Sequence, residues 1–390
     1  MDSFVFNTTP RLVIRPGSAR ELAQLSAMMA GARSLFVTDR GIREHRLDVE
    51  IIAALEKAGV DVSVFDAVKA DPSRATLDAA IEAARISKAT HVIGFGGGSS
   101  LDIAKLVALI AGSGENLDEA WGLNNARGPR LPLVLVPTTA GTGSEVTPVA
   151  IITVGAEEKR GVSSPVLLPD LAILDADLTL TVPPAITAAT GIDAMVHAIE
   201  AFTSASRNNN PLSRILAVEA LQLLGRHIEQ AVFTPKDLGA RSGMLFGACL
   251  AGMAFANSPV AAVHALAYPI GGQFKVAHGL SNALVLPHVL RFNADDPSNG
   301  AALAYGRLAP HLFDPWQSSD EPASDAHAFA DRLADLCFRL GLPTRLRDVG
   351  IPESALAAMA ADAMKQTRLL VNNPRPMTQK DALAIYRAAW

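Results

Sequence analysis

The chain has 390 residues, of which 49% are hydrophobic and 19% charged, and its formal net charge is −5. This length predicts two or three domains, and this composition supports a large core and excludes an intrinsically disordered protein. An acidic balance without a strongly basic segment argues against a nucleic-acid-binding protein or one that binds anionic membranes.

Cysteine usage and apolar patterning predict a cytoplasmic protein. Cys249 and Cys337 are the two cysteines, and each lies in an apolar helical context, so we expect buried thiols rather than a disulfide. The first residues lack the pattern of a signal peptide, and no stretch approaches about 18 consecutive apolar residues, so we expect no membrane span.

Short apolar runs alternate with helical patterns in the first half of the chain. Helices are predicted at 47–57 and after a cap at Asp71 or Ser73, and strands at 34–38, 60–65, 91–95 and 133–136. This alternation indicates βαβ units and a mostly parallel sheet.

Asp39 comes directly after the first of these strands. A carboxylate at this place can accept a hydrogen bond from an adenosine ribose and would repel a 2′-phosphate, which favours NAD over NADP. An aspartate that caps a turn is the alternative interpretation.

A glycine-rich segment, Gly-Gly-Gly-Ser-Ser at 96–100, follows the strand at 91–95 and leads into a helix from Leu101. Glycines let the backbone approach a pyrophosphate, and the following helix N-terminus offers free N–H groups and a positive dipole end. The segment differs from the Gly-x-Gly-x-x-Gly fingerprint because Ser99 stands at the last position. A tight strand-to-helix turn without a ligand is the alternative.

A second loop, 137–145, follows the strand at 133–136 and reads Pro-Thr-Thr-Ala-Gly-Thr-Gly-Ser-Glu. Its hydroxyls and backbone are suited to the phosphate, ribose or nicotinamide part of a dinucleotide. Such a loop alone does not indicate a particular ligand. Because it follows a βα unit with a glycine-rich loop, it supports a nucleotide site.

The pattern changes near Leu180, and beyond Pro183 and Pro184 it is helical almost to the end. A polar surface loop is predicted at 314–326, with helix breaks at 208–211 and at Pro269 with Gly271 and Gly272, and helices at 186–205, 211–230, 238–256 and 259–268. We therefore predict an N-terminal α/β dinucleotide-binding domain at 1–183 and an all-helical domain at 184–390.

Asp193, His197, His264 and His278 form a candidate metal-ligand set in the helical half. Asp193 and His197 are four residues apart, which places them on one face of a helix about one turn apart. His264 and His278 are separated by fourteen residues and the helix break, so one of them can end a helix while the other returns from the loop, just before Gly279. Three nitrogens and one oxygen suit Fe²⁺ or Zn²⁺ and tolerate other divalent metals. Packed histidines and a capping Asp193 are the alternative interpretation.

Together these motifs resemble the iron-containing (group III) alcohol dehydrogenases from end to end. The resemblance rests on 37–41, 96–105, 137–147, 191–200, 264–279 and the tail Asn-Asn-Pro-Arg at 372–375. It implies a dehydroquinate-synthase-like fold, with a Rossmann-like parallel-sheet domain and a helical domain. It also implies a homodimer or higher oligomer that interconverts a small alcohol and its aldehyde or ketone with NAD and Fe²⁺, or another divalent metal.

The resemblance assigns roles to particular residues of this chain. The metal would be held by Asp193, His197, His264 and His278, and Asp39 would set the preference for NAD. The remaining cofactor-binding candidates are Gly97, Gly98, Ser99, Asp102, Thr138, Thr139 and Thr142.

Tyr268 stands where the family often has a second histidine, four residues after the third ligand. A phenol can donate or relay a proton, although its ordinary pKa of about 10 makes it a different relay. Tyr268 and His278 are therefore the catalytic candidates. With Phe255 and Phe274, Tyr268 suggests an apolar pocket for a small neutral alcohol.

Three other functions compete with this interpretation. A maleylacetate-reductase-like enzyme would reduce a keto acid without metal, but that branch generally lacks the complete ligand set. A dehydroquinate-synthase-like lyase would need a basic pocket, for which 238–290 offers only Arg241 and Lys275 as candidates. A non-catalytic nucleotide- or metal-binding protein would bind NAD without consuming it.

Overall fold

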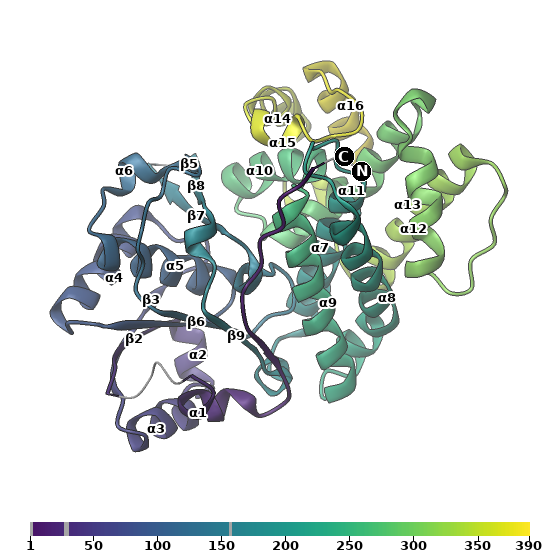
Figure 1. The fold of residues 1–390 in the computed structure, drawn as a ribbon. Helices are drawn as coiled ribbons and strands as arrows, with labels where there is room; N and C mark the ends of the chain where they lie inside the picture. The colour runs from purple at the N-terminus through teal and green to yellow at the C-terminus, as the bar shows by residue number, and fades with distance from the viewer. Residues whose placement is uncertain (1–2, 27–30, 156–157) are drawn as a thin grey trace. The chain divides into compact units, whose positions relative to one another are not determined.

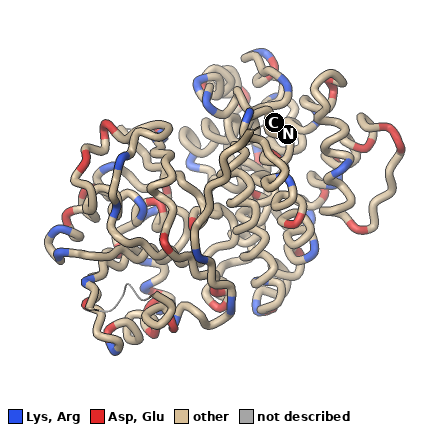
Figure 2. Tube along the Cα trace, viewed as in Figure 1, with Lys and Arg blue, Asp and Glu red and all other residues tan. Residues whose placement is uncertain are grey.

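The computed structural model describes residues 3–26, 31–155 and 158–390. The chain divides into two compact units, Asn7–Thr181 and Met1–Phe6 with Val182–Trp390. The first, the α/β unit, is built on a parallel sheet, and the second, the helical unit, consists of helices (Figure 1). The predicted fold class is therefore confirmed. Lys and Arg are interspersed with Asp and Glu along both units (Figure 2).

The main sheet of the α/β unit has six parallel strands in the order β1-β9-β6-β4-β2-β3. Their bounds are β1 Leu12–Ile14, β2 Arg33–Asp39, β3 Asp61–Val68, β4 His91–Gly96, β6 Leu133–Pro137 and β9 Leu171–Leu174. A smaller sheet joins β5 (Gly122–Leu123), β8 (Glu158–Ser163) and β7 (Val149–Val154). The four predicted strands are confirmed. The small sheet was not predicted, because β8 begins Glu-Lys-Arg and lacks an apolar run.

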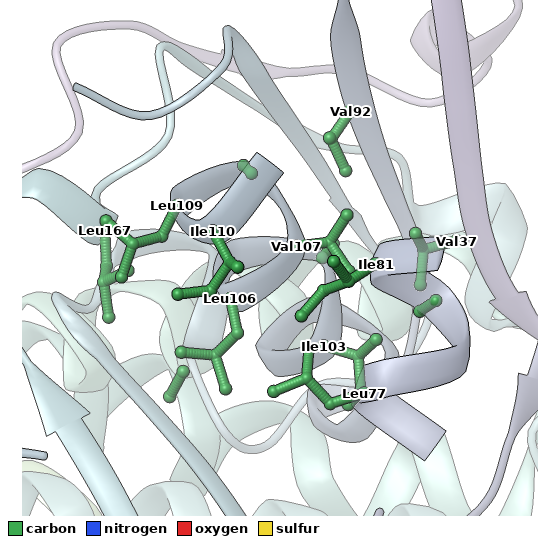
Figure 3. Packing of buried hydrophobic residues seen from close by; sticks show 14 of the residues in the cluster. Val37, Leu77, Ile81, Val92, Ile103, Leu106, Val107, Leu109, Ile110 and Leu167 are labelled. Atoms are coloured by element: carbon green, nitrogen blue, oxygen red, sulfur yellow. The ribbon is translucent and has the colours of Figure 1, made fainter. Parts of the chain in front are cut away.

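The strands β4, β6 and β9 of the main sheet are almost wholly buried and mostly apolar because both sheet faces are covered there, as expected for a parallel sheet. Successive residues of β6 alternate between two cores: Leu133 and Leu135 pack in one, and Val134 and Val136 in the other. The first core is covered by α4 (Arg74–Ile86) and α5 (Gly98–Ser113), as Figure 3 shows. The second is covered partly by α3 (Val49–Lys57).

Local capping explains where several helices begin. Ser73 accepts a hydrogen bond from the Thr76 N–H at 3.2 Å and starts α4, as one of the two predicted caps. Asp39 accepts from the Ile42 N–H at 3.1 Å and starts the short helix α2 (Arg40–Glu44). The other short helices of this unit are α1 (Leu22–Leu25) and α6 (Leu117–Ala120).

The helical unit is organised around α7 (Pro184–Thr203), which is buried along most of its length and packs against α8 (Pro211–Phe233) and α9 (Leu238–Asn257). The remaining helices are α10 Ala262–Phe274, α11 His278–Ala294, α12 Ala301–Leu312, α13 Pro322–Arg339, α14 Leu356–Ala363, α15 Thr367–Leu370 and α16 Gln379–Ala389. By length and composition α9 could cross a membrane, but 61% of its apolar window is buried inside the unit.

Two predicted helix boundaries are wrong. Pro269 does not break α10, which continues to Phe274 and ends at Lys275, where φ is +57°. A proline inside a helix removes one N–H donor and crowds the carbonyl four residues earlier, and α10 accommodates both effects. In addition, α13 begins at Pro322, inside the loop predicted at 314–326, because proline fits the first turn of a helix. The prediction for Cys249 and Cys337 is confirmed, since both are buried free thiols.

Candidate functional site

The central helix α7 carries Asp193 and His197 on one face. Both side chains are buried, with 2% and 4% of each residue exposed. Asp193 lies in the interior of the helix, so the alternative that it caps a helix end is wrong. Burial alone would raise the pKa of Asp193, but His197, His278 and His264 together with an amide hydrogen bond from Asn282 lower it. The carboxylate is thus held in its charged form.

The other two histidines come from α10 and α11. The Asp193 Oδ1 lies 3.9 Å from the Nε2 atoms of His197 and His264, and 3.6 Å from the Nε2 of His278. One ligand atom from each of the four residues falls within 4.8 Å of all the others. We call these four residues the candidate metal centre.

The expectation that one of the two later histidines ends a helix is wrong, whereas His278 does follow the loop, just before Gly279. His264 is the third residue of α10, and His278 is the first residue of α11. The next residue, Gly279, brings α11 close to α7, since a Cβ on it would lie 2.3 Å from the Ala189 carbonyl oxygen. Only glycine permits this approach, and it places the start of α11 against the helix that carries Asp193.

Glu200, also on α7, orients His264 from behind. One carboxylate oxygen accepts from the Val263 N–H at 2.7 Å, and the other lies 2.6 Å from the His264 Nδ1. With the Nδ1 proton held by this carboxylate, the Nε2 carries no proton, and its lone pair is free to coordinate an ion between the four ligand atoms. A carboxylate on the outer nitrogen of a histidine is the usual support of a metal-bound imidazole.

Asn282, one turn after His278 on α11, supports the carboxylate of Asp193. Its Nδ2 donates to the Asp193 Oδ1 at 2.6 Å, and the amide is fully buried. Its Oδ1 accepts no hydrogen bond from the residues that the structure describes. The Asn282 Nδ2 also lies 3.3 Å from the His264 Nε2 and 3.4 Å from the His278 Nε2, so this amide borders the candidate metal centre.

In the α/β unit, β4 leads through Gly96 into α5. Gly96 has a φ of +146°, which other residues rarely adopt. The first turn of α5 starts at Gly98 and receives no side-chain cap at Gly97. The Ser100 N–H donates to the Gly97 carbonyl oxygen at 3.0 Å, which leaves the N–H groups of Gly98 and Ser99 for an anion. Asp39, at the end of the neighbouring strand β2, lies beside this turn, because the Ser100 Oγ donates to its Oδ2 at 3.4 Å.

The second loop, 137–145, lies against the first. The strands β4 and β6 are neighbours, and the Thr138 N–H donates to the Gly96 carbonyl oxygen at 3.0 Å. A Cβ on Gly98 would lie 2.8 Å from the Thr142 Cγ2, so glycine is needed for the two loops to meet. Both loops thus lie at the carboxyl ends of parallel strands, where open α/β sheets bind their ligands.

Asp102 and Lys105, on α5, hold the second loop from the protein interior. Asp102 accepts from the Ser144 Oγ at 2.6 Å and from the Ile151 N–H at 2.9 Å. The Lys105 Nζ donates to the Ser144 Oγ and to the Val149 carbonyl oxygen, each at 2.8 Å. Burial lowers the pKa of Lys105 to about 8 and raises that of Asp102.

Known proteins match the whole of this architecture. The family model described as "Iron-containing alcohol dehydrogenase" matches residues 9–176, and that described as "Fe-containing alcohol dehydrogenase family, C-terminal" matches 187–390. The chain belongs to the iron-containing alcohol dehydrogenase family. As a member of this family, it is an oxidoreductase that acts on CH–OH groups.

Relatives and solved structures of the family cover the chain almost completely. The long-chain-alcohol dehydrogenase 1 of Geobacillus thermodenitrificans is 38% identical over 377 residues, which are 96% of this chain and 93% of that protein. A crystal structure of 1,3-propanediol oxidoreductase has a TM-score of 0.92 at 31% identity, with both chains fully covered. The sulfoacetaldehyde reductase of Bifidobacterium kashiwanohense, solved in complex with NAD⁺, has a TM-score of 0.87 at 28% identity and covers 100% of this chain and 99% of that chain.

The structure gathers the predicted residues of this dehydrogenase in two places. Asp193, His197, His264 and His278 come together in the helical unit. In the α/β unit, the two loops bring together Asp39, Gly97, Gly98, Ser99, Thr138, Thr139 and Thr142. Asp102 belongs to the same unit, but both of its carboxylate oxygens already accept hydrogen bonds from the protein. Its role as a cofactor contact stays a prediction.

Sequence reasoning missed the residues that support these sites. Glu200 lies seven residues after Asp193, two turns along the same helix face, and Asn282 lies four after His278. Both spacings were available as signals in the sequence. Arg368, whose Nη2 donates to the Tyr268 hydroxyl at 3.2 Å, is separated from it by 100 residues and gave no local signal.

Proposed function

We propose that this protein is an NAD-dependent alcohol dehydrogenase whose divalent metal, Fe²⁺ or a similar ion, is held by Asp193, His197, His264 and His278. The observation that carries the proposal is the candidate metal centre, with four ligand atoms within 4.8 Å of one another and Glu200 on the outer nitrogen of His264. When bound, such an ion acts as a Lewis acid towards the substrate oxygen.

The residues of the centre fix where the substrate oxygen is received. Three of the four side chains are nearly closed to solvent, whereas 44% of the His278 side chain is exposed. The substrate therefore approaches from the side of His278. The Phe255 ring stacks on His197 with centroids 4.4 Å apart, so an apolar side chain borders the centre at that histidine.

The loops of the α/β unit are proposed to bind NAD. Gly97, Gly98 and Ser99 offer backbone N–H groups of the first turn of α5 to the pyrophosphate, and Thr138, Thr139 and Thr142 contribute hydroxyls. Asp39 keeps one carboxylate oxygen on the Ile42 N–H and directs the other towards Ser100, where a ribose hydroxyl can also donate to it. The cofactor supplies the hydride chemistry, and the protein supplies position and charge.

Tyr268 is proposed to carry the proton to or from the substrate oxygen. Its ring centroid lies 6.4 Å from that of His278, on the exposed side of the centre. Its hydroxyl accepts a hydrogen bond from Arg368 and keeps its own proton available to donate. We further propose that the enzyme acts in the cytoplasm as a homodimer or higher homo-oligomer.

Replacement of single ligands tests the proposal. Asp193→Ala and His264→Ala should lose bound metal, measured by elemental analysis after purification without oxygen. Turnover of an alcohol panel should fall roughly 1000-fold or more, because a Lewis acid contributes several kcal/mol to the barrier. NAD affinity should stay unchanged, since the loops lie in the other unit.

His327→Ala is the matched control, because His327 is a half-exposed histidine on α13 that pairs with Asp295 and lies outside the centre. It should keep both metal and turnover. Full turnover by metal-free Asp193→Ala protein would refute the proposal.

A further inference from the structure

Arg368, on α15, is an exposed cation close to the candidate metal centre. Its guanidinium donates to the hydroxyl of Tyr268 on α10, the helix against which α15 packs. Among the residues that the structure describes, no carboxylate lies within ion-pair distance of Arg368. Its charge is therefore available to a ligand.

Tyr268 connects this guanidinium to the exposed side of the centre. Tyr268 follows His264 by one helical turn, and its ring lies next to that of His278 at 6.4 Å. His278 is also the ligand through which the centre is open to solvent. A substrate whose oxygen reaches the centre past His278 thus extends its other end towards Tyr268 and Arg368.

Neighbouring carboxylates do not neutralise this region. Asp362, on α14, pairs with Lys365 at 2.9 Å and accepts a hydrogen bond from Gln273. Lys275, which ends α10, donates to the Gly272 carbonyl oxygen and adds a second cation at that helix end. The cations Lys275, Lys365 and Arg368 thus outnumber the carboxylate of Asp362, whereas the whole chain has a net charge of −5.

We propose that Arg368, held by Tyr268, forms a subsite for an acidic group at the far end of the substrate. The preferred substrates would then be short alcohols and aldehydes that end in a carboxylate or sulfonate. A guanidinium presents paired N–H donors that match two oxygens of such a group, and its charge persists at every working pH. This proposal rests on the proposed function and revises the expectation of a neutral substrate.

A matched pair of aldehydes tests the subsite in the metal-loaded enzyme with NADH. Succinic semialdehyde and butanal have the same four-carbon chain, and only the first ends in a carboxylate. Wild-type protein should give a higher kcat/KM with the acid. Arg368→Gln should lower the ratio of the two kcat/KM values about 10–100-fold, mainly through KM for the acid, because a charge-assisted hydrogen bond is lost.

Two further variants and one inhibitor make the result specific. Arg368→Lys should restore part of the ratio, and Arg387→Gln, which removes an exposed cation on α16, should leave it unchanged. Succinate should inhibit butanal reduction competitively in the wild type, and more weakly in Arg368→Gln.

The outcomes separate the subsite from the proposed function. An unchanged ratio in Arg368→Gln, or a wild type that prefers butanal, overturns the subsite while dehydrogenase activity stands. A metal-loaded wild type that reduces neither aldehyde counts against both proposals.

Discussion

In the helical unit, the candidate metal centre consists of side chains on three helices, of which only His278 is exposed. In the α/β unit, by contrast, the cofactor loops present backbone groups at the ends of β4 and β6. The centre is held by contacts between side chains, such as Glu200 to His264 and Asn282 to Asp193. The loops are held by close approach, as at Gly98 and Thr142, and by Lys105 from beneath.

This difference determines how each region fails. A centre built from side chains loses its ligand when one polar contact is removed, while the helices remain packed around it. A loop built from backbone loses its ligand when a side chain is added, because an added Cβ occupies the space of the partner or of the ligand. Removing a polar contact in the centre and adding a Cβ in a loop therefore test whether the two regions bind their ligands in these two different ways.

The largest effect in this comparison is expected for Glu200→Gln. The amide retains one acceptor oxygen for two donors, so either Val263 or His264 loses its partner. Zn²⁺ affinity, measured by competition with a chelator, should fall about 10–100-fold, as is typical when the partner of a metal-bound histidine is lost. Glu219→Gln, an exposed carboxylate on α8, is the control. Equal Zn²⁺ affinity in the two variants would show that Glu200 does not support the centre.

A second prediction concerns Glu145, buried in the loop next to Lys105. Burial raises the pKa of Glu145 from 4.5 to about 7. The folded protein therefore binds more protons than the unfolded chain between these values, and stability falls as the pH rises through this window. From pH 5 to pH 7 the loss should be about 2 kcal/mol. Other groups titrate in the same window, such as His288, whose pKa burial lowers from 6.5 to about 4, and its contribution to stability rises with pH. The prediction is therefore a difference: in urea unfolding, the stability change from pH 5 to pH 7 should be about 2 kcal/mol more negative in the wild type than in Glu145→Gln. An identical slope in both would contradict the assignment.

The smallest effect is expected at Gly97, where the protein itself leaves room. A Cβ there would lie 3.6 Å from the Thr139 Oγ1, an ordinary contact, and Gly97 has a φ of −75° that alanine adopts readily. Gly97→Ala should keep its stability yet bind NAD about tenfold more weakly, a change of about 1.4 kcal/mol, because the methyl group stands where the pyrophosphate approaches.

Gly98→Ala provides the contrast, because its methyl group would collide with Thr142. It should lose thermal stability as well as NAD affinity, both measured by thermal unfolding with and without NAD. If Gly97→Ala binds NAD as tightly as the wild type does, the proposed close approach of the pyrophosphate to the backbone at Gly97 is wrong.

Much of the fold was readable because each signal was local. The strands at 91–95 and 133–136 are apolar runs buried on both faces, and Ser73 caps a helix as its sequence context predicted. The break expected at Pro269 was wrong because tertiary packing outweighs the loss of one backbone hydrogen bond. The middle strand of the small sheet, β8, reads Glu-Lys-Arg-Gly-Val-Ser, so it offered no apolar run from which its pairing with β7 could be predicted.

In the candidate site, too, the residues with a local sequence signal were predicted and those placed by tertiary packing were not. Asp193 and His197 are joined by helical spacing, and the glycine loop by its place after a strand, so both were predicted. The pairing of Arg368 with Tyr268 depends on how α15 packs against α10, which no local pattern encodes. The inward direction of Asp102 likewise depends on its contacts with Ser144 and Ile151, far along the chain.

The most direct test of the central claim is a metal titration of protein that has been freed of metal with a chelator. Turnover of an alcohol with NAD should rise in proportion to the bound divalent ion and saturate at one ion per chain. His264→Ala protein should neither bind the ion tightly nor regain turnover. Full turnover before any ion is added, or equally tight binding by His264→Ala, would contradict the account of the metal centre.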